Sequence, residues 1–215
     1  HKYLIRSQEK KYIIYLTPSN CTDIDTLPNL KEHLFKYKQI MDARRETKKG
    51  VNKWFHLHWP RREEYFKRKK LILPAMFERQ KVGYMEEEGY FGLSSNIIIQ
   101  KDKNYTLKYI LAILNSNLAF DWFYRYGKKR GIGVDIGVSK LRTFPVKKLT
   151  LSFQKPFKDC VDRILAITKD YDYLENPQKQ AKVKEYERQI DKIVYKLYEL
   201  TEKEIEIVEG FNKEL

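Results

Sequence analysis

The stretch EYERQIDKIVYKLYELTEKEIEIVE, residues 185–209, decides the fold of the C-terminal part of this chain. Apolar residues recur in it and just before it at intervals of three and four, with charged residues between them, which predicts an amphipathic helix. The apolar face, which needs a partner to cover it, comprises Val183, Tyr186, Ile190, Ile193, Val194 and Leu197. Thr201 and Glu204 form a capping box, which predicts a second, short helix ending before Gly210. We expect the two helices to fold back as a hairpin.

Upstream of this stretch, short candidate strands alternate with candidate helices. Four segments are rich in β-branched or aromatic residues and bounded by proline, glycine or asparagine, as strands are. These segments are residues 12–16, 54–57, 71–73 and 97–100. Helical spacing predicts helices over residues 27–43, 107–124 and 156–169, with Thr106 as the N-cap of the second. The sequence therefore predicts an α+β fold in which a short-stranded mixed sheet packs with helices and ends in a C-terminal helical hairpin arm.

The chain is strongly basic, and its charges are segregated. The 43 Lys+Arg against 29 Asp+Glu give a formal net charge of +14. Residues 31–82 hold sixteen cations and six anions (+10), residues 120–148 hold eight and two (+6), and residues 185–209 hold four and eight (−4). Segregation of this kind creates a basic surface that attracts phosphate. The pattern favours a nucleic-acid partner, and the alternative is a solvated lysine-rich surface.

Other features indicate where the protein works. No apolar run approaches the roughly 20 residues of a membrane span, and the charged first segment, residues 1–11, lacks a signal-peptide core. Cys21 and Cys160 are too few for a disulfide framework and too isolated for a zinc site. These features predict a soluble, cytoplasmic protein. Because the chain begins at His1 and enters directly on a candidate strand, we also expect it to be part of a longer protein.

Several segments, in order along the chain, resemble one known family. The pattern Ile-Asp-x-x-Val-Tyr-x-Leu-Tyr-x-Leu-Thr-x-x-Glu-Ile at residues 190–205 looks like the ending of target-recognition domains in restriction-modification enzymes and adenine-N6 DNA methyltransferases. Further segments that are similar to the family are residues 28–45, 54–61, 70–74, 111–116 and 141–146. Together they resemble the TaqI-like C-terminal specificity domain family.

The resemblance implies a division of labour. Residues 1–150 would form the DNA target-recognition domain, and residues 151–215 a helical arm that packs on it or on a catalytic domain outside this chain. The parent would be an adenine-specific DNA methyltransferase of a type II restriction-modification system, with or without a fused endonuclease. S-adenosylmethionine, and Mg²⁺ for an endonuclease, would belong to that catalytic part, so the chain would need no cofactor or metal itself. Its partners would be double-stranded DNA and the methyltransferase catalytic domain.

Three basic segments are candidates for DNA contact, because lysine and arginine hold phosphates and forked donors recognise base edges. They are a basic helix end, a strand that presents two histidines followed by two arginines, and a glycine-rich loop whose backbone can approach phosphate closely. The candidate residues are Arg44, Arg45, Lys48, Lys49, His56, His58, Arg61, Arg62, Lys128, Lys129 and Arg130. The alternatives are structural packing for at least one histidine and an ordinary mobile surface loop for the glycine-rich segment.

The sequence holds little that points to catalysis. The Asn/Asp-Pro-Pro-Tyr/Phe motif and the glycine-rich cofactor loop of the resembled methyltransferases are both missing. Asp25 or Asp42 with Glu46 and Lys48 only loosely approximates a nuclease site. We therefore expect a non-catalytic chain that recognises specific double-stranded DNA sequences. The alternatives are a specificity subunit of a multisubunit restriction system, a protein-interaction module with an incidental basic surface, and an RNA-binding module that stacks bases on aromatic rings.

Overall fold

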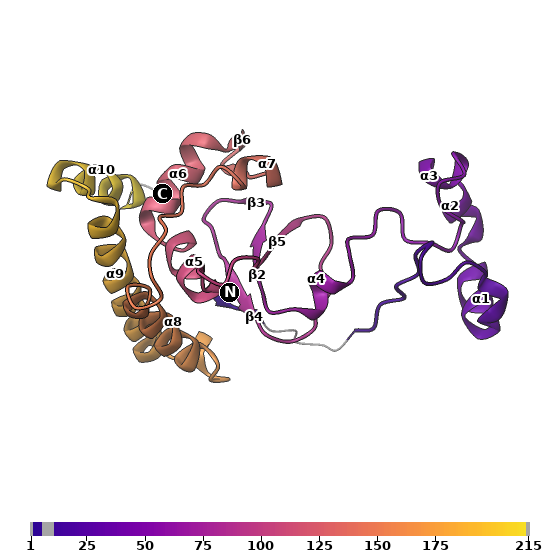
Figure 1. The fold of residues 1–215 in the computed structure, drawn as a ribbon, viewed down its shortest axis with the longest axis horizontal. Helices are drawn as coiled ribbons and strands as arrows, with labels where there is room; N and C mark the ends of the chain where they lie inside the picture. The colour runs from indigo at the N-terminus through magenta and orange to yellow at the C-terminus, as the bar shows by residue number, and fades with distance from the viewer. Residues whose placement is uncertain (1, 6–10, 214–215) are drawn as a thin grey trace. The chain divides into compact units, whose positions relative to one another are not determined.

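The computed structural model describes residues 2–5 and 11–213, which divide into two compact units (Figure 1). The small unit comprises residues 8–64, and the large unit comprises residues 1–7 and 65–215. Each unit has its own cluster of buried apolar residues. The fold is α+β, as predicted. Within the described ranges, no helix combines the length and the apolar composition that crossing a bilayer requires.

A four-stranded mixed sheet forms one layer of the large unit. Its strands, in spatial order, are β1 (Tyr3–Leu4), β4 (Gly83–Met85), β2 (Lys70–Pro74) and β5 (Ser95–Ile99). β1 runs parallel to β4, whereas β2 is antiparallel to both β4 and β5. Leu71 and Leu73 in β2 are fully buried, because residues two apart share one face of the sheet and this face belongs to the main core. The strands predicted near residues 71–73 and 97–100 are confirmed.

A second, three-stranded antiparallel sheet lies in the same unit. It consists of β3 (Met76–Phe77), β7 (Gly133–Asp135) and β6 (Lys128–Arg130), in that spatial order. The short helix α4 (Glu64–Lys67) precedes β2 in the sequence, and the short helix α7 (Val138–Leu141) follows β7. Phe77 and Val134 are buried in the main core, which joins this small sheet to the rest of the unit.

The helix predicted over residues 107–124 is two helices, α5 (Leu107–Leu114) and α6 (Asn117–Tyr126). The break occurs because two polar side chains bind backbone there. Asn115 Nδ2 donates to the Val82 carbonyl at 2.9 Å, its Oδ1 accepts from the Val82 N–H at 3.0 Å, and Ser116 caps α6. Such competing side-chain bonds favour caps over helix interiors. Thr106 caps α5, as predicted.

The C-terminal helices share the core of the large unit. They are α8 (Lys155–Thr168), the single-turn η2 (Tyr173–Glu175), α9 (Pro177–Tyr198) and α10 (Glu202–Lys213). In Figure 1, α8 and α9 lie side by side next to α5. The predicted apolar face of α9 is confirmed, because all six residues are buried in this core or packed against it. Residues on both sides of position 150 therefore contribute to one core, and the functional boundary expected there stays a prediction.

The capping box at the start of α10 is confirmed, but the predicted end of that helix is wrong. Thr201 N–H donates to Glu204 Oε2 at 2.7 Å. The helix continues through Gly210 because Phe211 stacks on Phe120, with ring centroids 5.7 Å apart. This packing outweighs the roughly 1 kcal/mol that a helical glycine costs. The chain leaves α9 at Glu199, which has a left-handed φ of 59°, and α10 packs on α6.

A buried polar cluster also ties the C-terminal helices to α6. The Asn117 N–H donates to Asp191 Oδ1 at 2.7 Å, Arg79 donates to Asn117 Oδ1 at 2.5 Å, and Tyr195 donates to Glu209 at 2.5 Å. Asp191 is 8% exposed. Burial raises the pKa of the Asp191 carboxyl to about 6, although the hydrogen bond from Asn117 lowers it.

The small unit is helical and loop-rich, without a strand among residues 11–64. Its elements are η1 (Ile24–Thr26), α1 (Pro28–Phe35), α2 (Lys38–Asp42) and α3 (Arg45–Lys48). The strands predicted over residues 12–16 and 54–57 are wrong: these segments share a backbone hydrogen bond, from the Leu57 N–H to the Leu16 carbonyl at 2.8 Å, but no ladder. The helix predicted over residues 27–43 is interrupted where the Tyr37 N–H bonds to the Leu34 carbonyl.

Candidate nucleic-acid interface

A carboxylate in the small unit holds two of the predicted DNA-binding residues together. Glu46, in α3, accepts a hydrogen bond from Arg45 Nε at 2.8 Å, and its other oxygen lies 2.5 Å from His58 Nε2. Burial pushes the pKa of the Glu46 carboxyl up, but the hydrogen bond and charge of Arg45, with the charge of His58, hold it below its usual value. The ionised carboxylate therefore fixes both side chains.

Hydrogen bonds to backbone carbonyls complete the link between residues 44–52 and 56–62. Arg44 Nη1 donates to the His56 carbonyl at 2.9 Å. Asn52 Nδ2 donates to the carbonyls of Leu57 at 3.3 Å and His58 at 3.0 Å. The structure thus brings the first two of the three predicted segments together on the small unit.

An exposed tryptophan lies beside Arg45 and His58. Trp59 is 54% exposed, its ring centroid lies 5.4 Å from the Arg45 guanidinium, and its ring is edge-on to the His58 ring at 4.5 Å. Lys48 and Lys49 are exposed at the end of α3. We call Arg45, Lys48, Lys49, His58 and Trp59 the Trp59 surface. A cation beside an exposed indole can hold a phosphate while the flat ring stacks on a base or sugar.

His56 lies inside the small unit and not on its surface. It is 4% exposed, its Nδ1 accepts from the Lys53 N–H at 3.1 Å, and its Nε2 donates to the Cys21 carbonyl at 2.7 Å. Both ring nitrogens are therefore used for internal bonds. The alternative of structural packing is confirmed for this histidine.

The two arginines that follow the Trp59 surface differ in their surroundings. Arg61 is half-buried, its carbonyl accepts from the Tyr15 hydroxyl, and burial lowers the pKa of its guanidinium. Arg62 is exposed, with Nη1 3.7 Å from a Glu64 oxygen. Of the two, Arg62 offers its charge more freely to solvent.

The third predicted segment is a β-hairpin of the large unit, so the expectation of a flexible loop is wrong. In β6 and β7, Lys128 lies opposite Asp135 and Arg130 lies opposite Gly133. Gly131 has φ +56°, whereas Ile132 does not adopt a positive φ, which is the pattern of a type II′ turn. This two-residue turn closes what we call the basic hairpin, residues 128–135.

One face of the basic hairpin is fixed in the core. Val134 and the following Ile136 are 0% exposed. The Ile136 N–H donates to the Ala75 carbonyl at 2.7 Å, and Asn96 Nδ2 donates to the Ile136 carbonyl at 2.9 Å. Gly127 permits this close packing, since a Cβ there would lie 2.2 Å from Val134 Cγ1. The hairpin is therefore held by side chains, backbone bonds and shape.

The three predicted cations project from both faces of the hairpin, because side chains alternate along a strand. Lys128 and Arg130 lie on the face opposite Val134, whereas Lys129 is paired with Val134 and shares its face. Lys128, Lys129 and Arg130 are all exposed. The Lys129 ammonium lies over the Tyr124 ring, and Arg130 Nε is 3.7 Å from Asp135. One carboxylate thus accompanies three cations, and the surface keeps a net positive charge.

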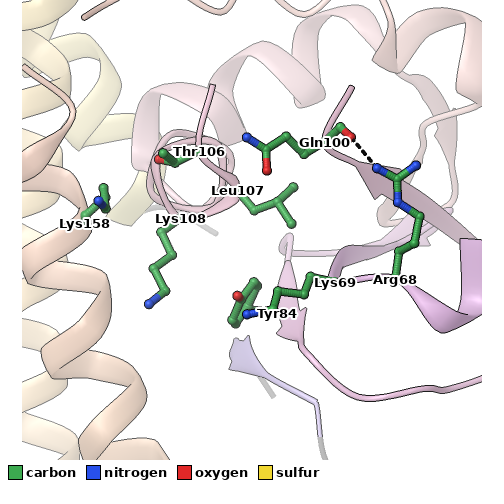
Figure 2. Close-up of a pocket in the computed structure, with 8 residues that line it drawn as sticks. All are labelled: Arg68, Lys69, Tyr84, Gln100, Thr106, Leu107, Lys108 and Lys158. Carbon is green, nitrogen blue, oxygen red and sulfur yellow. Dashed lines mark hydrogen bonds between the residues drawn. The ribbon is translucent and has the colours of Figure 1, made fainter. Parts of the chain in front are cut away.

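A further basic site in the large unit is a pocket of about 460 Å³ (Figure 2). Arg68 and Lys69 precede β2, Lys108 comes from α5, and Lys158 comes from α8. Figure 2 shows Arg68 turned to the Gln100 carbonyl, which accepts its hydrogen bond at 2.9 Å. Two of the cations are paired, Lys69 with Glu86 at 3.2 Å and Lys108 with Asp162.

Sequence reasoning missed both this pocket and Trp59. The four pocket cations come from three separate parts of the chain, and only the fold brings them together. Trp59, in contrast, had a local signal, because it stands between His58 and the cations at residues 61–62. An aromatic residue among cations is a recognised mark of nucleic-acid surfaces.

Comparison with known proteins identifies the family. A search of curated proteins finds no match to this chain. The family model of the TaqI-like C-terminal specificity domain matches residues 9–146, well over half of the chain. The match includes both the Trp59 surface and the basic hairpin. This chain therefore belongs to the TaqI-like C-terminal specificity domain family.

Proposed function

We propose that this chain is the DNA target-recognition domain of a type II restriction-modification enzyme whose catalytic part is an adenine-N6 DNA methyltransferase. The observation that supports this most is the basic hairpin. Three consecutive exposed cations lie on one strand of a β-ribbon that Val134 anchors in the core, and Lys128 and Arg130 project from the face opposite Val134. A two-stranded ribbon of this kind fits a DNA groove, and lysine and arginine neutralise phosphates.

The two surfaces would have different roles. On the basic hairpin, Lys128 and Lys129 contact phosphates and so set the position of the domain on the duplex. On the Trp59 surface, Glu46 orients Arg45, whose fork can donate to base edges, and Trp59 supplies a stacking face. The parent methyltransferase would flip an adenine out of the duplex positioned in this way.

S-adenosylmethionine would be held outside these residues. The glycine-rich segment that could hold a cofactor is the turn of a hairpin, where Gly127 and Gly133 lie against Val134 and the Phe77 carbonyl. A dinucleotide-type cradle instead needs a glycine loop between a strand and a helix. The residues present do not fit the cofactor, and no step of the proposed function involves it. The methyltransferase domain that would hold it, in this polypeptide or in another subunit, is the proposed protein partner.

Binding of the chain to a randomised duplex DNA pool over a salt series tests the proposal, with sequencing of the retained fraction. We expect a short enriched motif and a steep loss of affinity with salt. Salt-sensitive binding without enrichment would contradict sequence recognition by this chain alone. The absence of duplex binding would contradict the proposal and favour a protein-interaction module, and a preference for single-stranded RNA would favour an RNA-binding module.

A triple variant locates the contact. Lys128→Ala with Lys129→Ala and Arg130→Ala should lower the slope of log K against log salt by about 2–3, since each lost phosphate contact removes about 0.9. The matched control changes three exposed cations of α9, with the same loss of charge: Lys184→Ala, Arg188→Ala and Lys192→Ala. Equal slopes for the two triple variants would contradict the assignment of the hairpin.

A further inference from the structure

The tip of the basic hairpin presents a large apolar side chain to solvent. Ile132 is the second central residue of the turn and is 80% exposed. Turn positions are normally occupied by glycine, asparagine, aspartate or serine, which adopt the required backbone conformation or bond to it. The second central position of a type II′ turn needs no positive φ, so isoleucine can occupy it, but its side chain has no group that can bond to the turn and contributes nothing to the buried core. Its presence needs another explanation.

The charge around Ile132 indicates what would cover it. The residues that lead into the turn are Lys128, Lys129 and Arg130, and all three are exposed. Such a surface repels basic partners and attracts a polyanion. In duplex DNA the apolar surfaces are the stacked faces of the base pairs, which lie between the phosphate backbones. A tip that combines cations with one apolar side chain is therefore complementary to a duplex entered from a groove.

The hairpin is anchored in the core in a way that suits insertion of its tip into a duplex. Separating two stacked base pairs costs free energy, so the backbone that carries the inserted residue must be rigid. The support here is the buried pair Val134 and Ile136, together with the backbone bonds of Ile136 to Ala75 and Asn96. The turn has only two residues, so the tip has little freedom of its own.

We propose that Ile132 inserts between adjacent base pairs of duplex DNA and locally unstacks them while Lys128, Lys129 and Arg130 hold the flanking phosphates. This inference rests on the proposed function and extends it, since it assigns to the hairpin a deformation of the DNA. A sequence that unstacks easily, such as a pyrimidine–purine step, would then be favoured without any hydrogen bond to its bases.

The test uses the 215-residue chain and a series of duplexes of the enriched motif, or of mixed sequence where none is enriched. Each duplex carries 2-aminopurine at a different position, because the fluorescence of this base rises when it loses its stacking neighbours. We expect a rise at one step with the unaltered chain and with Ile132→Leu. For Ile132→Ser we expect no rise and about tenfold weaker binding, because burial of an isoleucine side chain is lost.

The control is a second exposed isoleucine. Ile207 in α10 is 58% exposed and stands between Glu206 and residues 208–209 in the acidic C-terminal segment. Ile207→Ser should leave both fluorescence and affinity unchanged. Because Ile132 is outside the core, Ile132→Ser should unfold at the same temperature as the unaltered chain, so a loss of binding does not reflect unfolding.

The outcomes separate this inference from the proposed function. Unaltered salt dependence with loss of the fluorescence rise in Ile132→Ser supports insertion, since the phosphate contacts remain. Duplex binding by the unaltered chain without a rise at any position would overturn insertion and leave the DNA-recognition function intact. Equal fluorescence for Ile132→Ser and the unaltered chain would also overturn it. No duplex binding by the unaltered chain would overturn both.

Discussion

The Trp59 surface and the basic hairpin both present cations, but they are built in different ways. The Trp59 surface is held by polar groups: Glu46 binds Arg45 and His58, and Arg44 binds a backbone carbonyl. The basic hairpin is held by apolar packing on the large core, through Val134 and Ile136. Side chains held by hydrogen bonds can rearrange around a ligand at a small cost in free energy, whereas a hairpin packed on an apolar core keeps its shape.

The cores behind the two surfaces differ in the same way. The small unit has 57 residues (8 to 64), and its buried apolar cluster consists of Leu16, Cys21, Ile24, Leu34 and Phe55. The cluster in the large unit joins both sheets, α5, α6, α8 and α9. A single core in a unit of this size supplies only about 3–5 kcal/mol of stability. The small unit should therefore open first, and the hairpin should persist.

The largest expected effect comes from Phe55→Ala. Removal of a buried phenylalanine costs about 3–5 kcal/mol, comparable to the whole stability expected for the small unit. We expect residues 8–64 to become sensitive to proteolysis while residues 65–215 remain protected, as mass spectrometry of limited digests would show. A single cooperative transition that includes both units would break the comparison, because it would mean that the small unit takes its stability from the large one.

Ile136→Ala makes the corresponding change behind the hairpin. A cavity at this fully buried position should lower the free energy of unfolding by about 3 kcal/mol, within the usual range for isoleucine to alanine. The large unit should nevertheless stay folded, because its core is much larger. Ile132→Ala is the matched control in the same hairpin and should change stability by less than about 0.5 kcal/mol, since this side chain is 80% exposed. Urea unfolding measures both.

The two units should also differ in how a single carboxylate responds to pH. Burial raises the pKa of the Asp191 carboxyl to about 6 in the folded state, above its ordinary value of 3.8, so the folded state binds its proton more tightly. Its contribution to stability is complete below about pH 4 and is lost as the pH rises through 6. Asp191→Asn keeps an oxygen that can accept from Asn117 but has no proton to lose. Between pH 4 and pH 7.5, its free energy of unfolding should therefore rise by roughly 2–3 kcal/mol relative to that of the unaltered chain.

The pKa of Glu46 shifts in the opposite direction to that of Asp191. Its folded-state pKa is lowered, so its contribution is present above its ordinary pKa of 4.5 and is lost as the pH falls through the folded value. Glu46→Gln should therefore destabilise the small unit at pH 7, and this effect should shrink as the pH falls below 4.5. Hydrogen exchange of the small unit, compared with urea unfolding of the large unit, separates the two responses. Parallel pH profiles for Asp191→Asn and Glu46→Gln would contradict the assignments.

The sequence predicted the large unit better than the small one, for a physical reason. The apolar faces of α8 and α9 are long enough for helical periodicity to be clear, and the structure confirms them. In the small unit the β-branched residues around Ile13 predicted a strand, yet Tyr12 and Ile13 are exposed and have no strand to pair with. Local propensity becomes structure only where a partner covers it.

The candidate site shows the same limit. Charge patterning located the cations, but it could not distinguish a glycine-rich loop from a hairpin, because the decisive contact of Gly127 is with Val134 across the sheet. It also could not show that Glu46 joins Arg45 to His58, since Glu46 and His58 are twelve positions apart in the sequence. Contacts between residues distant in sequence remain beyond periodicity and composition.

The smallest expected effect is the most direct comparison of the two supports. Gly50 in the small unit (φ +72°) and Gly131 in the hairpin turn (φ +56°) both adopt left-handed conformations, and an added Cβ at either position would meet no atom within 4 Å. Alanine at either site should therefore cost about 1–2 kcal/mol from backbone strain alone.

The rigid hairpin must retain the strain, so Gly131→Ala should lower the free energy of unfolding of the large unit by this amount. The small unit can relax, so Gly50→Ala should lower its stability by less and shift the hydrogen exchange of α3 instead. Gly137→Ala, at ordinary φ and also in open space, is the control for both. A larger loss at Gly50 than at Gly131 would mean that the polar support is the stiffer of the two.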